Sequence, residues 1–325
     1  MKLITYKINP EGNHLIGLVQ NNIIYNLNNH LGDISIVDLI QIKNYQNIVK
    51  NLISDNNICT HELKKVIILP PIPSPNSLRD AYSFRKHVET SRMNRGKEMI
   101  PEFDQFPVFY FSNHNAIFGH KEKIELMPDH FQKLDYELEF AIVINKKGKN
   151  ILKENAHKYI GGFLIMNDLS GRTLQMEEMK LNLGPAKGKD FATVIGPYLI
   201  TPDELESKKI HTEYGSKYDL QMKCFINGKL LSSGNTIDMY WTFEEIIERV
   251  SYGVELMPGD IIGSGTVGTG CLLEINGTNK RINPEYIEKW INAGDEIKMQ
   301  VDILGEITNE ISKTNSNHSI LKLKK

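Results

Sequence analysis

Segments typical of β-strands recur along almost the whole chain and do not alternate regularly with helical segments. After residue 100 they are VFYFSNH, KLDYELEFAIVIN, YIGGFLIMND, ATVIGPYLI, YDLQMKCFING, CLLEING and EIKMQVDILG. Helical spacing is confined to a few stretches, at 36–53, 77–96, 171–181 and 242–250. Because a parallel doubly wound sheet needs strands and helices in regular alternation, that fold is disfavoured. The sequence predicts an α+β fold that is mainly β.

A proline-rich stretch divides the chain into two expected domains. The segment LPPIPSPN, at 69–76, carries four prolines, which neither fit a helix interior nor donate to a central strand. Before it, the alternating segments KLITYKI, HLIGLVQ and IIYNL indicate a small β-meander over residues 2–26. We therefore expect a small N-terminal domain at 1–70 and a larger domain at 71–325.

The balance of charges argues against polyanionic partners. Lys and Arg total 38 and Asp and Glu total 40, so the net charge of -2 gives no long-range attraction for nucleic acid or an anionic membrane. The cysteines Cys59, Cys224 and Cys271 have no spacing typical of a disulfide framework or a metal knuckle, which favours a reducing compartment. No export signal or membrane-spanning run is recognisable, so we expect a cytoplasmic protein.

The segment KLDYELEFAIVIN is the most informative part of the chain. Successive side chains of a strand point to opposite faces, so Asp135, Glu137 and Glu139 would share one face. The simpler interpretation is an antiparallel strand with its polar face in water. Two features favour burial instead: the same face continues into Ala141 and Val143, and no Lys or Arg lies among the acids. Adjacent buried carboxylates repel each other, and a divalent cation relieves that repulsion.

Two further acids could join this group. Asp168 follows an apolar strand in GGFLIMNDLSGRTLQ and precedes the expected helix cap Ser170. Asp80 lies seven residues before His87 in the segment expected to form a helix, so the two side chains would fall within about 20° on one helix face. Each acid alone is more simply explained by turn formation, capping or solvation. Together with the strand acids they offer only oxygen ligands, which favours Mg²⁺, Ca²⁺ or Mn²⁺ over zinc.

Taken in order, several motifs resemble those of the fumarylacetoacetate hydrolase family. They are RDAYSFRKH, LDYELE, MNDLSGRTLQ, GKDFATVIGP, GSGT and LLE, and they run from about Asp80 to the C-terminus. The resemblance implies a mixed β-roll catalytic domain with a small β-rich N-terminal domain, a homodimer and a small keto-acid substrate. The wider superfamily also contains acylpyruvate hydrolases, decarboxylases, isomerases and dehydratases, so the resemblance alone does not define the reaction.

The resemblance also assigns roles to individual residues. It implies that a divalent cation is held by Asp80, Glu137, Glu139 and Asp168, with Thr193 lining the cation region. His87 would be the base, Glu274 would orient it, and Lys189 would stabilise an oxyanion or protonate the leaving carbon. Substrate contacts are implied for Tyr82, Arg95, Tyr110, Gln175 and Thr266.

This residue set favours a metal-dependent hydrolase that cleaves a carbon–carbon bond in a 3,5-diketo acid such as fumarylacetoacetate, as in tyrosine and other aromatic amino acid breakdown. Met179 replaces the tyrosine that the animal-type hydrolase carries at the matching position, and Arg95 is one residue closer to His87. An acylpyruvate is therefore an alternative substrate. Decarboxylation or isomerisation of a related keto acid is a second alternative, and a non-catalytic binding protein on the same scaffold is a third.

Two glycine-rich stretches are not interpreted as nucleotide-binding loops. The pattern GxGxxG at Gly263, Gly265 and Gly268 is followed by CLLEI, which reads as a strand instead of the helix that a dinucleotide-binding loop requires. In GPAKGKD, Gly184 and Gly188 enclose three residues where a phosphate loop needs four. Neither stretch therefore supports a nucleotide site.

Overall fold

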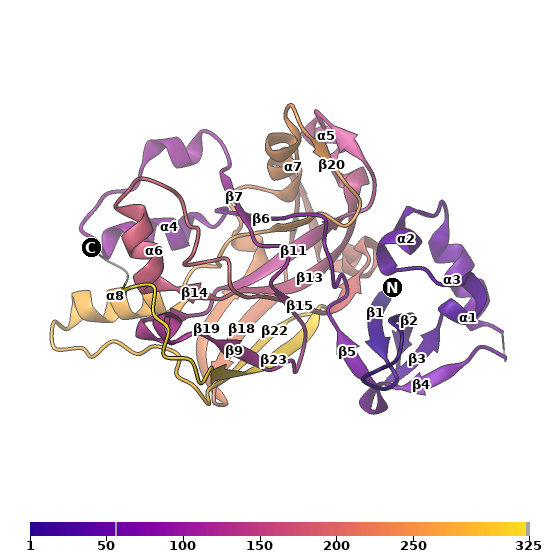
Figure 1. Ribbon diagram of the computed structural model, residues 1–325. Helices are drawn as coiled ribbons and strands as arrows, with labels where there is room; N and C mark the ends of the chain where they lie inside the picture. The colour runs from indigo at the N-terminus through magenta and orange to yellow at the C-terminus, as the bar shows by residue number, and fades with distance from the viewer. Residues whose placement is uncertain (56, 323–325) are drawn as a thin grey trace.

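A large sheet dominates the computed structural model, which describes residues 1–55 and 57–322. The main path of this twelve-stranded sheet runs β4-β3-β2-β1-β15-β13-β11-β21-β6-β7, with β5 paired to β1 and β8 paired to β15. Its strands are β1 (Lys2–Lys7), β2 (Leu15–Gln20), β3 (Ile23–Asn26), β4 (Thr60–Glu62), β5 (Ile67–Leu69), β6 (Leu78–Ala81), β7 (Phe109–Ser112), β8 (Ile117–Phe118), β11 (Leu138–Ile144), β13 (Ile160–Asp168), β15 (Thr193–Ile200) and β21 (Ile261–Gly263). Strands β1–β4 lie in the lobe on the right of Figure 1.

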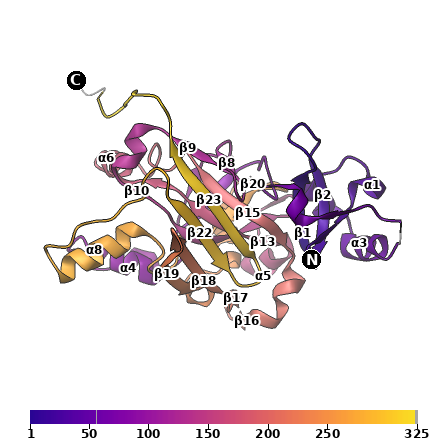
Figure 2. The same ribbon diagram turned by 90° about the horizontal axis from the view of Figure 1, so that it is seen from below.

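A second sheet of five strands runs β19-β18-β22-β23-β9 and is seen from below in Figure 2. Its strands are β9 (Ile124–Leu126), β18 (Gln221–Ile226), β19 (Lys229–Asn235), β22 (Glu296–Val301) and β23 (Gly305–Lys313). Three small pairs complete the β-structure, formed by β10 (Leu134–Asp135) with β14 (Ser170–Gly171), β12 (Gly148–Lys149) with β20 (Glu255–Leu256), and β16 (Lys209–Thr212) with β17 (Gly215–Tyr218).

The helices are short and are spread between the strands. They are α1 (Asn28–Leu31), α2 (Ile36–Gln41), α3 (Tyr45–Ile53), α4 (Arg85–Met93), α5 (Lys153–Ala156), α6 (Arg172–Met179), α7 (Phe243–Ser251) and α8 (Leu272–Ile282). This arrangement confirms the predicted α+β, mainly β fold. The helices expected over 171–181 and 242–250 are also confirmed, as α6 and α7.

Strand β11 is buried on both faces, which explains why its sequence is almost continuously apolar. Phe140 and Ile142 belong to the larger core, which also contains residues of the five-stranded sheet. Ala141 and Val143 point to the opposite face and pack in a second core that includes Leu39 of α2. The acid near the start of this strand, Glu139, is therefore buried.

The N-terminal strands join the same large sheet as the later ones. Strand β1 pairs antiparallel with β15, where Lys2 faces Ile200 and Leu3 faces Leu199. The proline-rich stretch contains no helix or strand over residues 70–77, close to the division expected at residue 70. That division remains a prediction, and the end of the second expected domain, residues 323–325, lies outside the described residues.

The helix expected over 77–96 is wrong in its first half. Leu78–Ala81 form β6, which pairs with both β21 and β7, and α4 begins only at Arg85. The expected N-cap Ser77 instead donates its hydroxyl to Asp260 at 2.6 Å. Pairing with strands distant in sequence therefore overrides the local helical pattern. Asp80 lies on a strand, so the argument that placed it on one helix face with His87 does not hold.

The segment CLLEING was expected to be a strand, but its residues begin helix α8. A short apolar run fits a strand or a buried helix equally well. Asp135 favours the helix. Its carboxylate accepts hydrogen bonds from the backbone N–H groups of Leu272 and Leu273 at 2.7 and 2.9 Å and so caps the helix. The reason given for rejecting the GxGxxG pattern was therefore wrong, because a helix does follow it.

Two other elements are interrupted where the sequence indicated continuity. The stretch 36–53 forms two helices, α2 and α3, instead of one. The acidic strand also divides into β10 and β11, because the backbone N–H of Glu137 donates to the Asn167 side chain at 3.1 Å instead of to a neighbouring strand. This break separates Asp135 from the other two acids.

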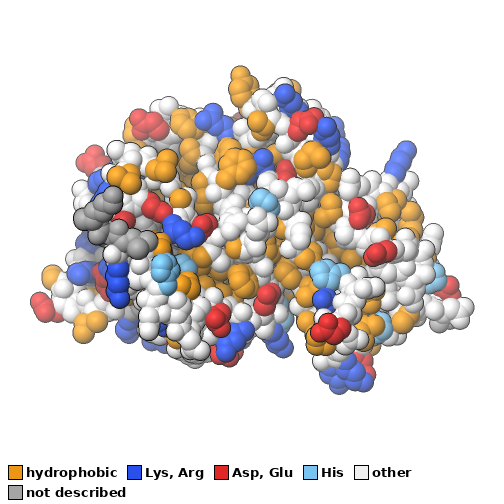
Figure 3. All heavy atoms as spheres, viewed as in Figure 1, with side chains coloured by type: hydrophobic (Ala, Val, Ile, Leu, Met, Phe, Trp, Pro, Cys, Tyr) orange, Lys and Arg blue, Asp and Glu red, His pale blue; other side chains and the backbone are white. Residues whose placement is uncertain are grey.

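Acidic and basic side chains are interspersed over the face shown in Figure 3, without a large patch of one sign. Across residues 1–55 and 57–322, no helix combines the length and the apolar character needed to cross a membrane.

Candidate functional site

A cavity of about 580 Å³ brings together most of the residues singled out in the sequence. Those that line it are Asp80, Tyr82, His87, Arg95, Tyr110, Glu137, Glu139, Gln175, Lys189 and Thr266. Asp168 and Glu274 lie behind this lining, in contact with Lys189 and His87 respectively. Thr193 is buried and faces Asp168 across the β13–β15 ladder, but it is not among the lining residues. The prediction that these residues share one site therefore has structural support, while their roles remain predictions.

Asp80, Glu137, Glu139 and Asp168 form what we call the acid cluster. The first three each offer a carboxylate oxygen within 4.8 Å of the others. Gly265 positions two of them, because its backbone N–H lies 3.1 Å from both Asp80 Oδ1 and Glu139 Oε2. The φ angle of Gly265 is +79°, a region that residues with a Cβ rarely adopt. The glycine pattern thus holds carboxylates instead of a nucleotide.

Asp168 is connected to the other acids through Lys189 and Tyr110. The Lys189 ammonium donates to Glu137 Oε2 at 2.5 Å and to Asp168 Oδ2 at 2.7 Å. The Tyr110 hydroxyl donates to Asp80 Oδ2 at 2.9 Å and also contacts Asp168 Oδ2. The other oxygen of Asp168, Oδ1, is buried and has no hydrogen-bond partner. A buried carboxylate oxygen without a hydrogen-bond partner is typical of a site that binds a ligand.

Arg172 was missed as a site residue and proves to be a second buried cation beside the acid cluster. It donates to Asp135 Oδ2 and to Glu137 Oε1, each at 2.8 Å. Arg172 directly follows the segment NDLSG, and the sequence shows no other basic residue near Asp168. This position could have identified Arg172 as a partner of the acids. Asp135 thus connects Arg172 to helix α8. It does not share one face with Glu137 and Glu139, contrary to the prediction from the sequence.

The protonation behaviour of the acid cluster indicates a shortage of positive charge. Burial and the nearby Asp168 raise the pKa of Asp80 to about 7. Burial and neighbouring carboxylates, Asp80 first, also raise the pKa of Glu139 well above its usual value. Burial alone would raise the pKa of Glu137 too, but Lys189 and Arg172 lower it below its ordinary value. Both cations therefore contact Glu137 and Lys189 also contacts Asp168, while neither donates a hydrogen bond to Asp80 or Glu139.

These residues fit a hard divalent cation. The cluster is buried, every donor is a carboxylate oxygen, and Asp168 Oδ1 lacks a partner. Mg²⁺, Ca²⁺ and Mn²⁺ prefer such oxygen ligands. Buried carboxylates without a counter-charge are strongly unfavourable, and a cation removes that penalty.

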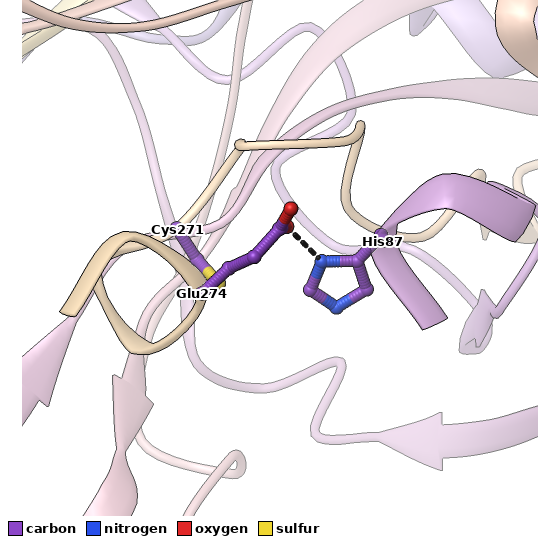
Figure 4. Close-up of side chains that lie close together, drawn as sticks. All are labelled: His87, Cys271 and Glu274. Carbon is purple, nitrogen blue, oxygen red and sulfur yellow. Dashed lines mark hydrogen bonds and ion pairs between the residues drawn. The ribbon is translucent and has the colours of Figure 1, made fainter. Parts of the chain in front are cut away.

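His87 and Glu274 form what we call the imidazole–carboxylate pair on the other side of the cavity. His87 Nδ1 donates to Glu274 Oε2 at 2.7 Å, and both side chains are buried (Figure 4). The other Glu274 oxygen accepts the backbone N–H of Thr269 at 2.9 Å. The hydrogen on Nδ1 leaves a lone pair on Nε2, at the end of the ring that points away from Glu274. A histidine held in this way is arranged to accept a proton.

The remaining lining residues shape the entrance. Arg95 is exposed, and its Nε donates to the backbone carbonyl of Ser91 at 3.0 Å. Ser91 itself was not singled out in the sequence, although it lies one helical turn after His87 and its buried hydroxyl has no partner. Gln175 accepts a hydrogen bond from Arg172 at 2.9 Å, and Met179 lines the cavity where the sequence departs from the animal-type enzyme.

Comparisons with known proteins identify a family for this chain. Residues 77–312 match the family described as fumarylacetoacetate (FAA) hydrolase C-terminal. The chain is 29% identical over 252 residues to the oxaloacetate tautomerase YisK of Bacillus subtilis, covering 77% of this chain and 75% of that protein. It is 32% identical over 208 residues to the mitochondrial oxaloacetate tautomerase Fahd2a of Rattus norvegicus, covering 63% of this chain and 58% of that protein.

A solved structure is similar over nearly the full chain. It is maleylpyruvate hydrolase from Sphingobium sp. SYK-6 in complex with manganese(II) and pyruvate, with a TM-score of 0.70 and 20% identity, covering 97% of this chain and 100% of that one. At this identity the likeness establishes the fold alone.

Proposed function

Because this chain belongs to the fumarylacetoacetate hydrolase family, we propose that it is a metal-dependent enzyme acting on a small 2-oxo dicarboxylic acid, with keto–enol tautomerisation of oxaloacetate as its reaction. The observation that carries this proposal is the placement of the acid cluster and the imidazole–carboxylate pair beside one cavity. Two relatives named oxaloacetate tautomerase, in a bacterium and in the rat, favour this reaction.

Asp80, Glu137, Glu139 and Asp168 would hold the divalent cation. The manganese(II) ion in the similar maleylpyruvate hydrolase supports a divalent metal. A bound cation would polarise the ketone of a 2-oxo acid and so acidify the adjacent carbon. The ion could be Mn²⁺, Mg²⁺ or Ca²⁺, since all three accept an all-oxygen shell.

The side chains then have separate tasks. His87 Nε2 would take a proton from the carbon beside the ketone and deliver it to the ketone oxygen, which converts keto form to enol. Glu274 would stabilise the transient imidazolium through the existing hydrogen bond of 2.7 Å. Burial lowers the pKa of Lys189, but the larger effect of Asp168 and Glu137 raises it above its usual value, so Lys189 stays charged. Arg95, at the exposed rim, would bind a carboxylate of the substrate.

Hydrolysis of a diketo acid such as fumarylacetoacetate is the second candidate. It is favoured by the His87–Glu274 hydrogen bond, which suits activation of water as well as removal of a proton from carbon. Tyrosine breakdown, a homodimer and the individual substrate contacts belong with this candidate as proposals. The names of the sequence relatives favour tautomerisation over it.

One set of assays separates the two candidates. Purified protein with Mn²⁺ is given oxaloacetate, fumarylacetoacetate and an acylpyruvate in parallel, and products are identified by NMR. We expect accelerated enol–keto exchange of oxaloacetate without loss of carbon. Cleavage of a diketo acid with little effect on oxaloacetate would instead support the hydrolase. Tight Mn²⁺ binding without turnover of any of the three would contradict both and favour a binding protein.

A further inference from the structure

Cys271 is a buried residue that the proposed function does not use. One ligand atom each from Cys271, His87 and Glu274 lie within 4.8 Å of one another, and the thiol lies beside the Glu274 side chain in Figure 4. We propose that these three residues, which we call the thiol triad, form a second metal site that binds a soft divalent cation such as Zn²⁺ and switches the enzyme off.

The donor atoms distinguish this site from the acid cluster. The thiol triad offers sulfur, nitrogen and one carboxylate oxygen, which is a ligand set typical of zinc. The acid cluster offers oxygen only, which Mg²⁺ and Mn²⁺ accept and which zinc uses less readily. The two sites are therefore expected to select different ions.

The fold holds the three ligands together from two helices. Cys271 immediately precedes α8 and Glu274 lies in its first turn, three residues later, so both side chains fall on the same side of the helix start. His87 lies on α4, which packs against α8. All three side chains are at most 6% exposed. Ligand atoms of tetrahedral zinc lie about 3.5 Å apart, so His87 and Glu274, now 2.7 Å apart, would separate slightly and a small movement of Cys271 would complete the site.

Binding at the thiol triad changes the protons in a defined way. The Cys271 thiol releases its proton to solvent and binds as the thiolate. His87 Nδ1 must present a lone pair to the metal, so the ring hydrogen moves to Nε2 and the hydrogen bond to Glu274 is lost. His87 Nε2 then no longer accepts a proton. Of the three ligands, His87 lines the cavity, so we expect water to enter from there as the fourth ligand. Zinc is thus expected to abolish activity without displacing the ion of the acid cluster.

Cobalt(II) spectroscopy tests the site without relying on activity. The full-length protein is first saturated with Mg²⁺ to fill the acid cluster, and Co²⁺ is then added alone. We expect a thiolate-to-cobalt charge-transfer band in the near ultraviolet that saturates at one equivalent. The band should disappear in Cys271→Ser, which keeps the size of the side chain.

Two other cysteines supply matched controls. Cys59 lies 3.6 Å from His61 Nε2 and is the competing thiol with an imidazole neighbour, while Cys224 is a buried thiol in the main core. Cys59→Ala and Cys224→Ala should keep the band. No band in the wild type, a band that survives in Cys271→Ser, or a band lost in Cys59→Ala would each overturn the proposal.

Two further measurements test the proposal even if Cys271→Ser does not fold. Zinc X-ray absorption of the Mg²⁺-loaded wild type should show one sulfur at about 2.3 Å, and a shell of oxygen and nitrogen alone would overturn the proposal. With an active substrate, Cys271→Ser should raise the zinc concentration for half-inhibition at least tenfold. If no substrate is turned over, the proposed function fails, while the cobalt and zinc spectra still decide the second site.

Discussion

The two sides of the cavity differ in how their charges are balanced. The acid cluster comes from strands and loops of the large sheet, and burial and neighbouring carboxylates raise the pKa of Asp80 and of Glu139. The imidazole–carboxylate pair comes from helices α4 and α8 and is satisfied by its own hydrogen bonds. The first side therefore depends on a bound cation to ionise fully, whereas the second forms its hydrogen bonds without one.

The largest expected effect comes from removing a cluster carboxylate. Glu139→Gln keeps the shape and the acceptor for the Gly265 N–H but deletes one metal-binding charge. We expect Mn²⁺ binding, measured by calorimetry, to fall below detection and activity to be lost. The metal-free variant should be at least as stable to urea as the wild type, because a buried carboxylate without a counter-charge has been removed.

Glu125→Gln changes an exposed glutamate and is the matched control for both measurements. If Glu139→Gln bound Mn²⁺ like the wild type, the acid cluster would not be the metal site.

Replacing His87, the proposed base, should lower activity without changing metal binding at the acid cluster. His87→Gln is expected to lower kcat by about 10²–10⁴-fold, the usual contribution of a general base. Mn²⁺ affinity should stay within twofold of the wild type, because His87 is not part of the acid cluster. His157→Gln, at an exposed position, should leave both quantities unchanged. A parallel loss of metal binding in His87→Gln would show that the two sides are not independent.

Arg172 offers a test of how the two sides are joined. It bridges Asp135, which caps α8, and Glu137 of the acid cluster. Arg172→Met leaves two buried carboxylates without this partner, which should lower the free energy of unfolding by about 3–5 kcal/mol. Urea unfolding measures this change, and Arg281→Met, at an exposed site, should cause almost none. A small effect for Arg172→Met would mean that Lys189 and the α8 backbone suffice for both acids.

The sequence was informative where the site depends on local alternation and less so where it depends on distant partners. Glu137 and Glu139 could be predicted as neighbours because their spacing in the chain almost fixes their direction. Asp80 was assigned to the right cavity but to the wrong element, because the pairing of β6 with β21 and β7 is invisible locally. Likewise, nothing near Asp135 in the sequence indicates that it caps a helix that begins at Leu272.

The burial of Glu137 and Glu139 was predicted from the sequence and is confirmed, but the basic side chains that accompany them were not. No Lys or Arg lies among the acids of 134–144, so the segment indicated a metal ion but no basic side chain as the counter-charge. Lys189 and Arg172 approach from later segments and hold the pKa of Glu137 below its ordinary value, whereas Lys189 only partly offsets the raised pKa of Asp168 and Asp80. The three-dimensional arrangement decides which carboxylate has a basic partner. It therefore also decides that Glu137 is paired with Lys189 and Arg172, whereas Asp80 and Glu139 are not.

The smallest effect in this series concerns the competition between protons and metal. Burial and Asp168 raise the pKa of Asp80 to about 7, so below that pH a cation must displace at least one proton to bind. Mn²⁺ affinity should therefore fall at least tenfold for each pH unit below 7, because the pKa of Glu139 is raised as well and its proton must also be displaced. Calorimetry between about pH 5.5 and 8.5 measures this slope, with protons released on binding as a second reading.

The free energy of unfolding of the metal-free protein should also depend on Asp80, but it should fall as the pH rises. Because the folded-state pKa of Asp80 lies above its unfolded value, its protonated form stabilises the fold at low pH, and that contribution is lost as the pH rises through 7. Added Mn²⁺ should restore the loss, since a cation takes the place of the proton. Mn²⁺ affinity that does not change with pH below 7 would mean that Asp80 is already ionised, and that Lys189 balances more of the acid cluster than its contacts with Glu137 and Asp168 indicate.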